Sequence, residues 1–187
     1  MAFKDIKVID PYVEKGWTAE LKLTLATPAE VDALEANINA SMPVGYKEYV
    51  TTLGFGDYCN YIRIDMPSKI LSGYEEYQRF LGEYWFWEMG EDILAKERAL
   101  ESVKIGDTID GDVIIFHPSR SDELFVLPRH DDMLHRIGSN LYEGIDWLCV
   151  SRNNPHSGSV GETHERRYFV PHNPFAYTHG VLWPEDI

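Results

Sequence analysis

The apolar residues change their spacing at Val103, and this change constrains the fold more than any other feature of the chain. Before Val103 they mostly recur every three or four residues, which is typical of amphipathic helices. After it they alternate with polar residues or form short runs, which is typical of strands. Strands that follow one another through short connections favour antiparallel pairing. The sequence therefore predicts an α+β fold, in which helices cover a mainly antiparallel β-sheet.

Three local signals define the first third of the chain. Leucines alternate with polar residues between 21 and 25, which predicts a half-buried strand. Residues 27–30, Thr-Pro-Ala-Glu, form a capping box with proline at the first helical position, so a helix is expected to follow. A second helix is expected over residues 43–53, where apolar residues recur at helical spacing. Gly54 is expected to end it, because glycine tolerates the left-handed conformation of a helix end.

Aromatic residues dominate the middle of the chain. A strand is expected over residues 61–66, and the Ser-Gly-Tyr-Glu box at 72–75 predicts the start of the next helix. The residues expected to share its apolar face are Tyr74, Tyr77, Leu81 and Tyr84. Residues 85–87, Trp-Phe-Trp, cannot all face one core, so at least one is expected at an edge or an interface. A further helix is expected over 91–101, with Ile93, Leu94 and Leu100 inward.

The second half of the chain predicts consecutive strands and one last helix. Asp110 and Gly111 are expected in a tight turn that precedes a buried strand. Ser139 or Asn140 is expected to cap the last helix, where Leu141 begins an apolar face. The predicted strands after the turn are 113–116, 123–127 and 133–137.

Four short stretches stand in a distinctive order within residues 28–150. They are Met-Pro-Val-Gly-Tyr-Lys-Glu-Tyr-Val-Thr-Thr-Leu-Gly-Phe-Gly at 42–56, Gly-Asp-Thr-Ile-Asp-Gly-Asp-Val-Ile-Ile-Phe-His-Pro at 106–118, Leu-Phe-Val-Leu-Pro-Arg-His at 124–130 and Gly-Ile-Asp-Trp-Leu-Cys at 144–149. Together they resemble the SUKH superfamily domain, whose members include bacterial immunity proteins and a fungal cell-wall regulator. The chain differs in carrying Gly-Phe-Gly at 54–56, where many members have Asn-Gly-Gly. The resemblance implies a SUKH-like fold that binds another protein.

The same pattern divides the chain into three parts. Residues 1–27 are expected to form an N-terminal strand segment, and residues 28–150 the SUKH-like domain. From Ser151 prolines punctuate the chain, yet residues 151–187 carry too many apolar side chains for a free tail. We therefore expect them to form a C-terminal extension packed on the domain.

Acidic side chains outnumber basic ones, giving a formal net charge of −14. Nearly all of the excess lies in residues 28–150, which carry 23 acidic and 10 basic side chains. This balance argues against a nucleic-acid backbone as direct partner, because phosphate binding needs clustered lysines and arginines. Two interpretations stay open: a surface that promotes solubility, and a surface that steers association with a basic partner.

No catalytic or cofactor motif is found. The aspartates at 107, 110 and 112 do not have the spacing of a calcium loop, and a hairpin turn is favoured. His130 and His135 are five residues apart, which fits no common helical metal site. A nucleophile elbow, a dinucleotide fingerprint and a P-loop are all missing. A metal-dependent hydrolase built on His130, His135, His164 and His172 is the weakest alternative, and no cofactor or metal is expected.

The resemblance and the charge together predict a non-catalytic immunity protein that neutralises a nuclease-type toxin through an acidic surface. The residues expected to bind the toxin are Glu75, Glu76, Glu83, Trp85, Trp87, Glu88, Asp131 and Asp132. The alternative is an intracellular regulator or scaffold of the cell-wall regulator type. Because the N-terminus lacks a signal-peptide pattern and no run of 18 apolar residues occurs, we expect a cytoplasmic protein that does not contact membranes.

Overall fold

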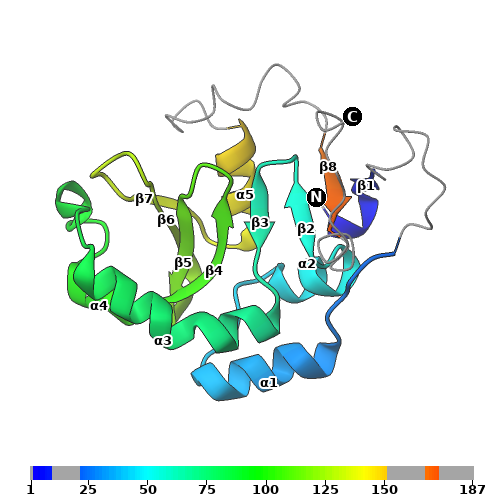
Figure 1. Cartoon of the computed structure of the whole chain (residues 1–187), viewed down its shortest axis with the longest axis horizontal. Helices are drawn as coiled ribbons and strands as arrows, with labels where there is room; N and C mark the ends of the chain where they lie inside the picture. The colour runs from blue at the N-terminus through cyan, green and yellow to red at the C-terminus, as the bar shows by residue number, and fades with distance from the viewer. Residues whose placement is uncertain (1, 10–21, 151–166, 173–187) are drawn as a thin grey trace, which may run out of the picture.

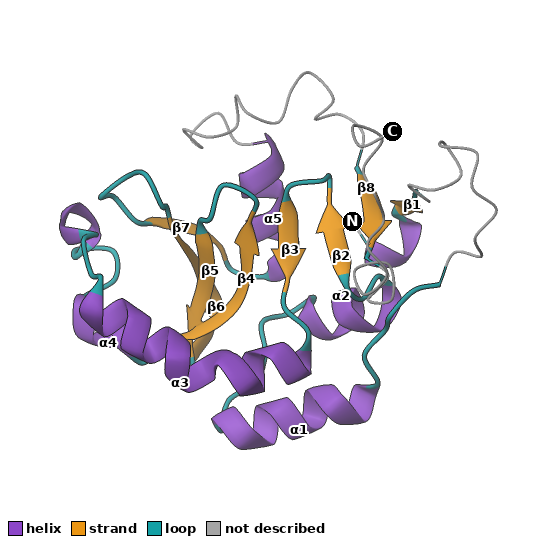
Figure 2. Ribbon diagram, viewed as in Figure 1, coloured by secondary structure: helices purple, strands orange, loops and turns teal. Residues whose placement is uncertain are grey.

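The computed structural model describes residues 2–9, 22–150 and 167–172, and these residues contain one sheet of eight strands with five α-helices (Figures 1 and 2). The strands are Lys7–Val8 (β1), Gly56–Tyr58 (β2), Ile62–Ile64 (β3), Val103–Thr108 (β4), Val113–His117 (β5), Arg120–Leu127 (β6), His135–Gly138 (β7) and Tyr168–Pro171 (β8). The α-helices are Pro28–Ile38 (α1), Tyr46–Thr52 (α2), Pro67–Glu83 (α3), Lys96–Leu100 (α4) and Leu141–Val150 (α5), and two short 3₁₀ helices are Phe3–Asp5 (η1) and Glu88–Gly90 (η3).

The strands lie in the order β1-β8-β2-β3-β4-β5-β6-β7. Every neighbouring pair is antiparallel except β1 and β8, which are parallel. The predicted α+β fold with a mainly antiparallel sheet is confirmed. Strands β1 and β8, which lie next to each other at one side of the sheet, belong to the predicted segments 1–27 and 151–187. The sheet therefore extends beyond both ends of the predicted domain at 28–150. The remaining parts of those two segments lie outside the described residues.

Strand β5 shows why the sequence there reads as a continuous apolar run. Ile114 and Phe116 face a core cluster that includes residues of α1, α2 and α5. Ile115, between them, faces a second cluster formed with the C-terminal half of α3, Trp87 and α4. Because side chains alternate across a strand, both faces of the central sheet are covered by apolar side chains. Burial on both faces removes the polar alternation that marks a one-sided sheet.

Two predicted helix caps are confirmed. At the start of α1, the Glu30 amide donates to the Thr27 hydroxyl at 3.3 Å, and the Glu30 carboxylate accepts from the Thr27 amide at 2.7 Å. Before α5, the Asn140 side-chain oxygen accepts from the Glu143 amide at 3.0 Å. Each pair satisfies amide groups that a helix N-terminus leaves without intrahelical partners.

The predicted start of the long helix was wrong. Helix α3 begins at Pro67, whose fixed φ suits the first helical position, and not at Ser72. The Ser72 hydroxyl instead donates back to the Lys69 carbonyl oxygen at 3.2 Å inside the helix. Helix α2 also begins later than expected, at Tyr46 instead of Pro43, while Gly54 adopts the predicted left-handed conformation with φ of 77°.

Two further local expectations need correction. The described part of the leucine segment, residues 22–27, forms no strand, and Leu25 is exposed. Its backbone instead pairs with the end of α2, where the Ala26 amide donates to the Val50 carbonyl oxygen at 2.9 Å. The helix expected over 91–101 is limited to α4, and Ile93 is exposed instead of inward. None of the helices in the described part of the chain has the length and hydropathy that a bilayer crossing requires.

Candidate protein-binding surface

Helix α3 carries the most distinctive surface of the described structure. Its inward side chains Ile70, Tyr77 and Leu81 are buried in the two core clusters. Residues separated by three or four positions share a helix face, so Lys69, Gly73, Glu76, Phe80 and Glu83 form one outward stripe. We call this stripe, together with Tyr84, the α3 surface.

A depression of about 300 Å³ lies along the α3 surface. The helix supplies most of its walls, and Lys104 of β4 supplies one edge. The full set of lining residues is Asp65, Lys69, Ile70, Gly73, Tyr74, Glu76, Tyr77, Phe80 and Lys104. The depression therefore has a charged end near Asp65 and an aromatic end near Phe80.

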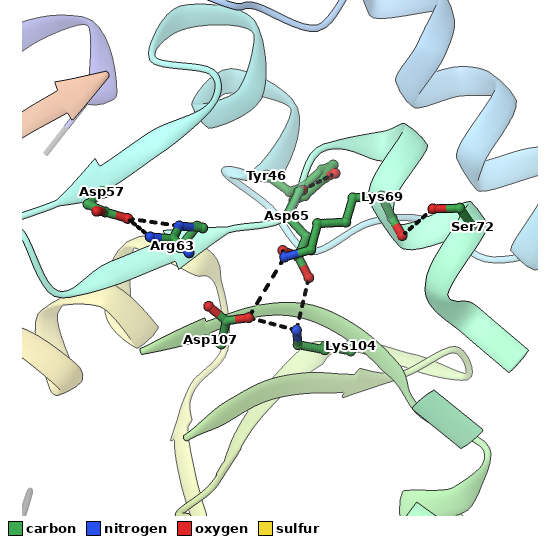
Figure 3. Close-up of polar contacts among 8 residues, drawn as sticks. All are labelled: Tyr46, Asp57, Arg63, Asp65, Lys69, Ser72, Lys104 and Asp107. Atoms are coloured by element: carbon green, nitrogen blue, oxygen red, sulfur yellow. Dashed lines mark hydrogen bonds and ion pairs between the residues drawn. The ribbon is translucent and has the colours of Figure 1, made fainter. Parts of the chain in front are cut away.

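The charged end is a closed ion-pair cluster (Figure 3). Asp65 is only 3% exposed, and its carboxylate lies 2.5 Å from Lys69 Nζ and 3.4 Å from Lys104 Nζ. Asp107 completes the set, at 2.7 Å from Lys104 Nζ and 3.8 Å from Lys69 Nζ. Burial disfavours the charged form of Lys104, but the carboxylates of Asp65 and Asp107 outweigh that effect and raise its pKa. Two positive and two negative charges thus cancel.

The backbone holds Asp65 in this position. Its amide donates to the Ile105 carbonyl oxygen of β4 at 2.8 Å, and its own carbonyl oxygen accepts from the Tyr46 hydroxyl at 2.8 Å (Figure 3). Desolvation of the Tyr46 phenol raises its pKa strongly, so the hydroxyl stays protonated and remains a donor. The cluster therefore connects the start of α3 to α2 and β4.

The aromatic end is exposed and carries unneutralised negative charge. Phe80 is 43% exposed and Tyr84 60% exposed, and their ring centroids lie 5.3 Å apart. Glu76, Glu83 and Glu88 are exposed as well, and none of them pairs with a basic side chain among the described residues. Of these three carboxylates only Glu76 lines the depression, so its aromatic end combines apolar area with one unpaired carboxylate.

The predicted binding residues fall into three groups. Glu75, Glu76, Glu83 and Glu88 are exposed on or next to α3. Asp131 and Asp132 lie in the β6–β7 loop, where the Asp131 carboxylate accepts from the Met133 amide at 3.0 Å. This loop lies near η3, since an added Cβ on Gly90 would come within 2.3 Å of the Leu134 side chain. Trp85 is half-buried and has the Lys96 ammonium 6.0 Å from its ring centroid.

Trp87 does not lie at the surface, contrary to the expectation that it contacts a partner. The sequence offers it as an exposed anchor, yet it is 2% exposed and belongs to the second core cluster. Its neighbour Phe86 stacks on it with ring centroids 4.2 Å apart and is itself 40% exposed. The expectation that at least one of the three rings lies at an edge is therefore met by Phe86.

Sequence reasoning missed Phe80 and assigned Tyr84 to the buried face. Both follow Glu76 at steps of four residues, so their shared face was readable from the sequence. The signal was hidden because Tyr77, one position after Glu76, is buried and gives the helix a second aromatic stripe.

The described histidines of the hydrolase alternative do not all lie at one place. His135 belongs to β7, and His172 directly follows β8. Five strands lie between β7 and β8, so the two are separated by about 28 Å at the usual strand spacing. They cannot ligate the same ion, and His164 lies outside the described residues. Within those residues, no three His, Cys, Asp or Glu side chains are arranged to hold a metal.

The three aspartates near Gly111 form a hairpin turn, as expected. The Gly111 amide donates to the Thr108 carbonyl oxygen at 3.0 Å. The buried Asp112 carboxylate accepts from the Thr108 hydroxyl and from the Arg129 amide, each at 3.0 Å. These bonds fix the turn between β4 and β5 and the start of the β6–β7 loop.

Comparison with protein-family models gives no match for this chain, and comparison with curated proteins gives none either.

Proposed function

We propose that this chain is a non-catalytic protein-binding domain of the immunity type, which neutralises a nuclease-type toxin by occupying its basic surface. The α3 surface is the part that makes the contact. The proposal includes a cytoplasmic location, where such a toxin would otherwise act.

One observation carries the proposal: the exposed rings of Phe80 and Tyr84 share the outward stripe of α3 with Glu76 and Glu83, whose carboxylates have no basic partner among the described residues. Buried aromatic side chains supply most of the affinity at many protein interfaces. Free carboxylates accelerate association with a basic partner and contribute to specificity. A nuclease needs a basic cleft to bind phosphates, so its cleft is complementary to this surface in charge.

The order of motifs that resembles the SUKH superfamily supports the same proposal, because that superfamily includes immunity proteins. It also includes a cell-wall regulator, which makes an intracellular scaffold the alternative. Recovery of the full chain from its native cell separates the two. One basic partner at equal stoichiometry supports the immunity function, whereas several housekeeping partners support the scaffold.

The direct test is titration calorimetry of the full chain against an inactivated nuclease-type toxin domain encoded beside it. Phe80→Ala and Tyr84→Ala are each expected to weaken binding at least tenfold, which corresponds to about 1.4 kcal/mol. Leu71→Ala is the matched control, because Leu71 is also exposed on α3 but lies outside the stripe. Binding should weaken as salt concentration rises, since the carboxylates are exposed. No binding at low salt would rule out the proposal.

A further inference from the structure

We propose that the depression beside Gly73 receives one arginine side chain of the protein partner. This inference rests on the proposed function and specifies the chemical group that the α3 surface recognises. It follows from the size, the charge and the ring content of the depression.

The depression is larger than the space that a single ordered water molecule needs. The volume of about 300 Å³ is roughly tenfold the share of one water molecule in the liquid, so an extended side chain can enter. Gly73 forms part of the wall, and a Cβ built on it would meet nothing within 4 Å. The absence of a side chain at this position keeps the depression open along the helix.

The charge of the depression favours a cation. Lys69 and Lys104 are both paired with Asp65 and Asp107, so that end contributes no net charge. Glu76 is then the one lining residue whose charge is not compensated by a described neighbour. An anionic group would meet the unpaired carboxylate of Glu76, and at the other end both lysines already hold carboxylate partners.

The rings distinguish arginine from lysine. Tyr74 and Phe80 both line the depression, and Phe80 is partly exposed. A guanidinium is planar and weakly hydrated, so it can stack on a ring while it donates two hydrogen bonds to a carboxylate. An ammonium is compact and strongly hydrated, and it loses more on entering a site with apolar walls. Glu76 and Phe80, one helical turn apart, present a carboxylate and a ring together.

The first test uses N-acetyl-arginine amide as the probe and NMR chemical shifts of the full chain as the readout. The expected result is saturable shifts at the Gly73 amide and the Phe80 ring, with weaker shifts for the lysine analogue and none for the neutral citrulline analogue. Glu76→Gln is expected to weaken binding of the arginine probe at least fivefold. Glu75→Gln is the matched control, because it makes the same charge change on the same helix but does not line the depression.

A second pair of variants tests the cavity itself. Gly73→Leu is expected to fill the depression and abolish the shifts, and the fold should tolerate it because the Cβ position is open. Gly82→Leu is the control, since Gly82 is equally open on α3 and does not line the depression. Equal shifts with citrulline, or retained arginine binding in Gly73→Leu, would overturn the inference.

The same four variants, titrated against the toxin domain, separate this inference from the proposed function. If the toxin binds but Glu76→Gln and Gly73→Leu behave like their controls, the arginine subsite is wrong and the immunity function stands. If the arginine probe binds as expected and the toxin does not, the subsite stands and the toxin is not the partner.

Discussion

Trp87 donates its indole N–H to the Pro128 carbonyl oxygen at 2.7 Å and so joins the segment after α3 to the end of β6. Both residues are buried, and the ring belongs to the cluster that covers the second face of the sheet. The next residue towards the N-terminus, Phe86, stacks on the same ring from outside. Two adjacent aromatic side chains therefore have opposite environments, one in the core and one at the surface.

Replacement of Trp87 is expected to destabilise the fold more than it affects any surface contact. Trp87→Ala should lower the free energy of unfolding by about 3–5 kcal/mol, because it leaves a large cavity. Trp87→Phe should cost about 1–3 kcal/mol, since it leaves the buried Pro128 carbonyl oxygen without its donor. Phe86→Ala, the control, should cost about 1 kcal/mol or less. Urea unfolding measures all three, and equal losses at positions 86 and 87 would contradict the structure.

Neutralising Asp65 is expected to lower the stability of the fold, because Lys69 and Lys104 both lose a carboxylate partner. Asp65→Asn removes the shared buried partner of Lys69 and Lys104 and should lower the free energy of unfolding by about 1.5–3 kcal/mol, the usual range for hydrogen bonds to charged groups. The control is Asp32→Asn at the pair with Lys47, where both side chains are at least half exposed and the loss should stay below about 1 kcal/mol. Thermal or urea unfolding measures both. If the two losses are equal, the cluster is no more than a surface contact.

How much of this could be predicted from sequence depends on the range of the interactions. The Thr27 capping box predicted α1 correctly, because its hydrogen bonds join residues three apart. The same four-residue signal at Ser72 failed, because Pro67 had already started α3 and the hydroxyl could bond within the helix. No local signal predicts the pairing of Lys7 with Tyr168 or the contact of Asp65 with Lys104, since distant segments make both. The α3 surface is an intermediate case. The sequence spacing predicts which of its residues share a helix face, but it does not predict that this face is exposed.

The stability of the fold should fall in acid through Asp57. Burial favours the protonated form of this carboxyl, but the hydrogen bond with His172 and the charge of Arg63 outweigh burial and lower its pKa. The folded state therefore binds protons less readily than the unfolded state, where the pKa is about 3.9. The resulting stabilisation is complete above that value and is lost as pH falls through the lower, folded pKa.

The test compares wild type with Asp57→Asn by urea unfolding between pH 5 and pH 2. The difference in free energy of unfolding should be largest near pH 5 and should shrink steadily towards pH 2. Asp32→Asn is the control, because the Asp32 side chain is 62% exposed, and the difference of this variant from wild type should stay small throughout. A difference for Asp57→Asn that does not change with pH would show that this carboxyl is not linked to folding.

Two glycine-to-alanine changes should have opposite effects. A Cβ on Gly56 would lie 2.3 Å from the Val170 carbonyl oxygen and 2.4 Å from Phe169 Cζ, so alanine there must push β8 away from β2. Because Phe169 is fully buried, Gly56→Ala should lower the free energy of unfolding by more than about 2 kcal/mol and increase amide exchange over Tyr168–Pro171.

At Gly73, inside α3, an added Cβ meets no atom within 4 Å. Gly73→Ala should therefore raise the free energy of unfolding by about 0.5–1 kcal/mol, because alanine favours the helix. Unfolding and hydrogen exchange read out both, and a Gly56→Ala variant as stable as wild type would mean that β8 does not pack this closely on β2.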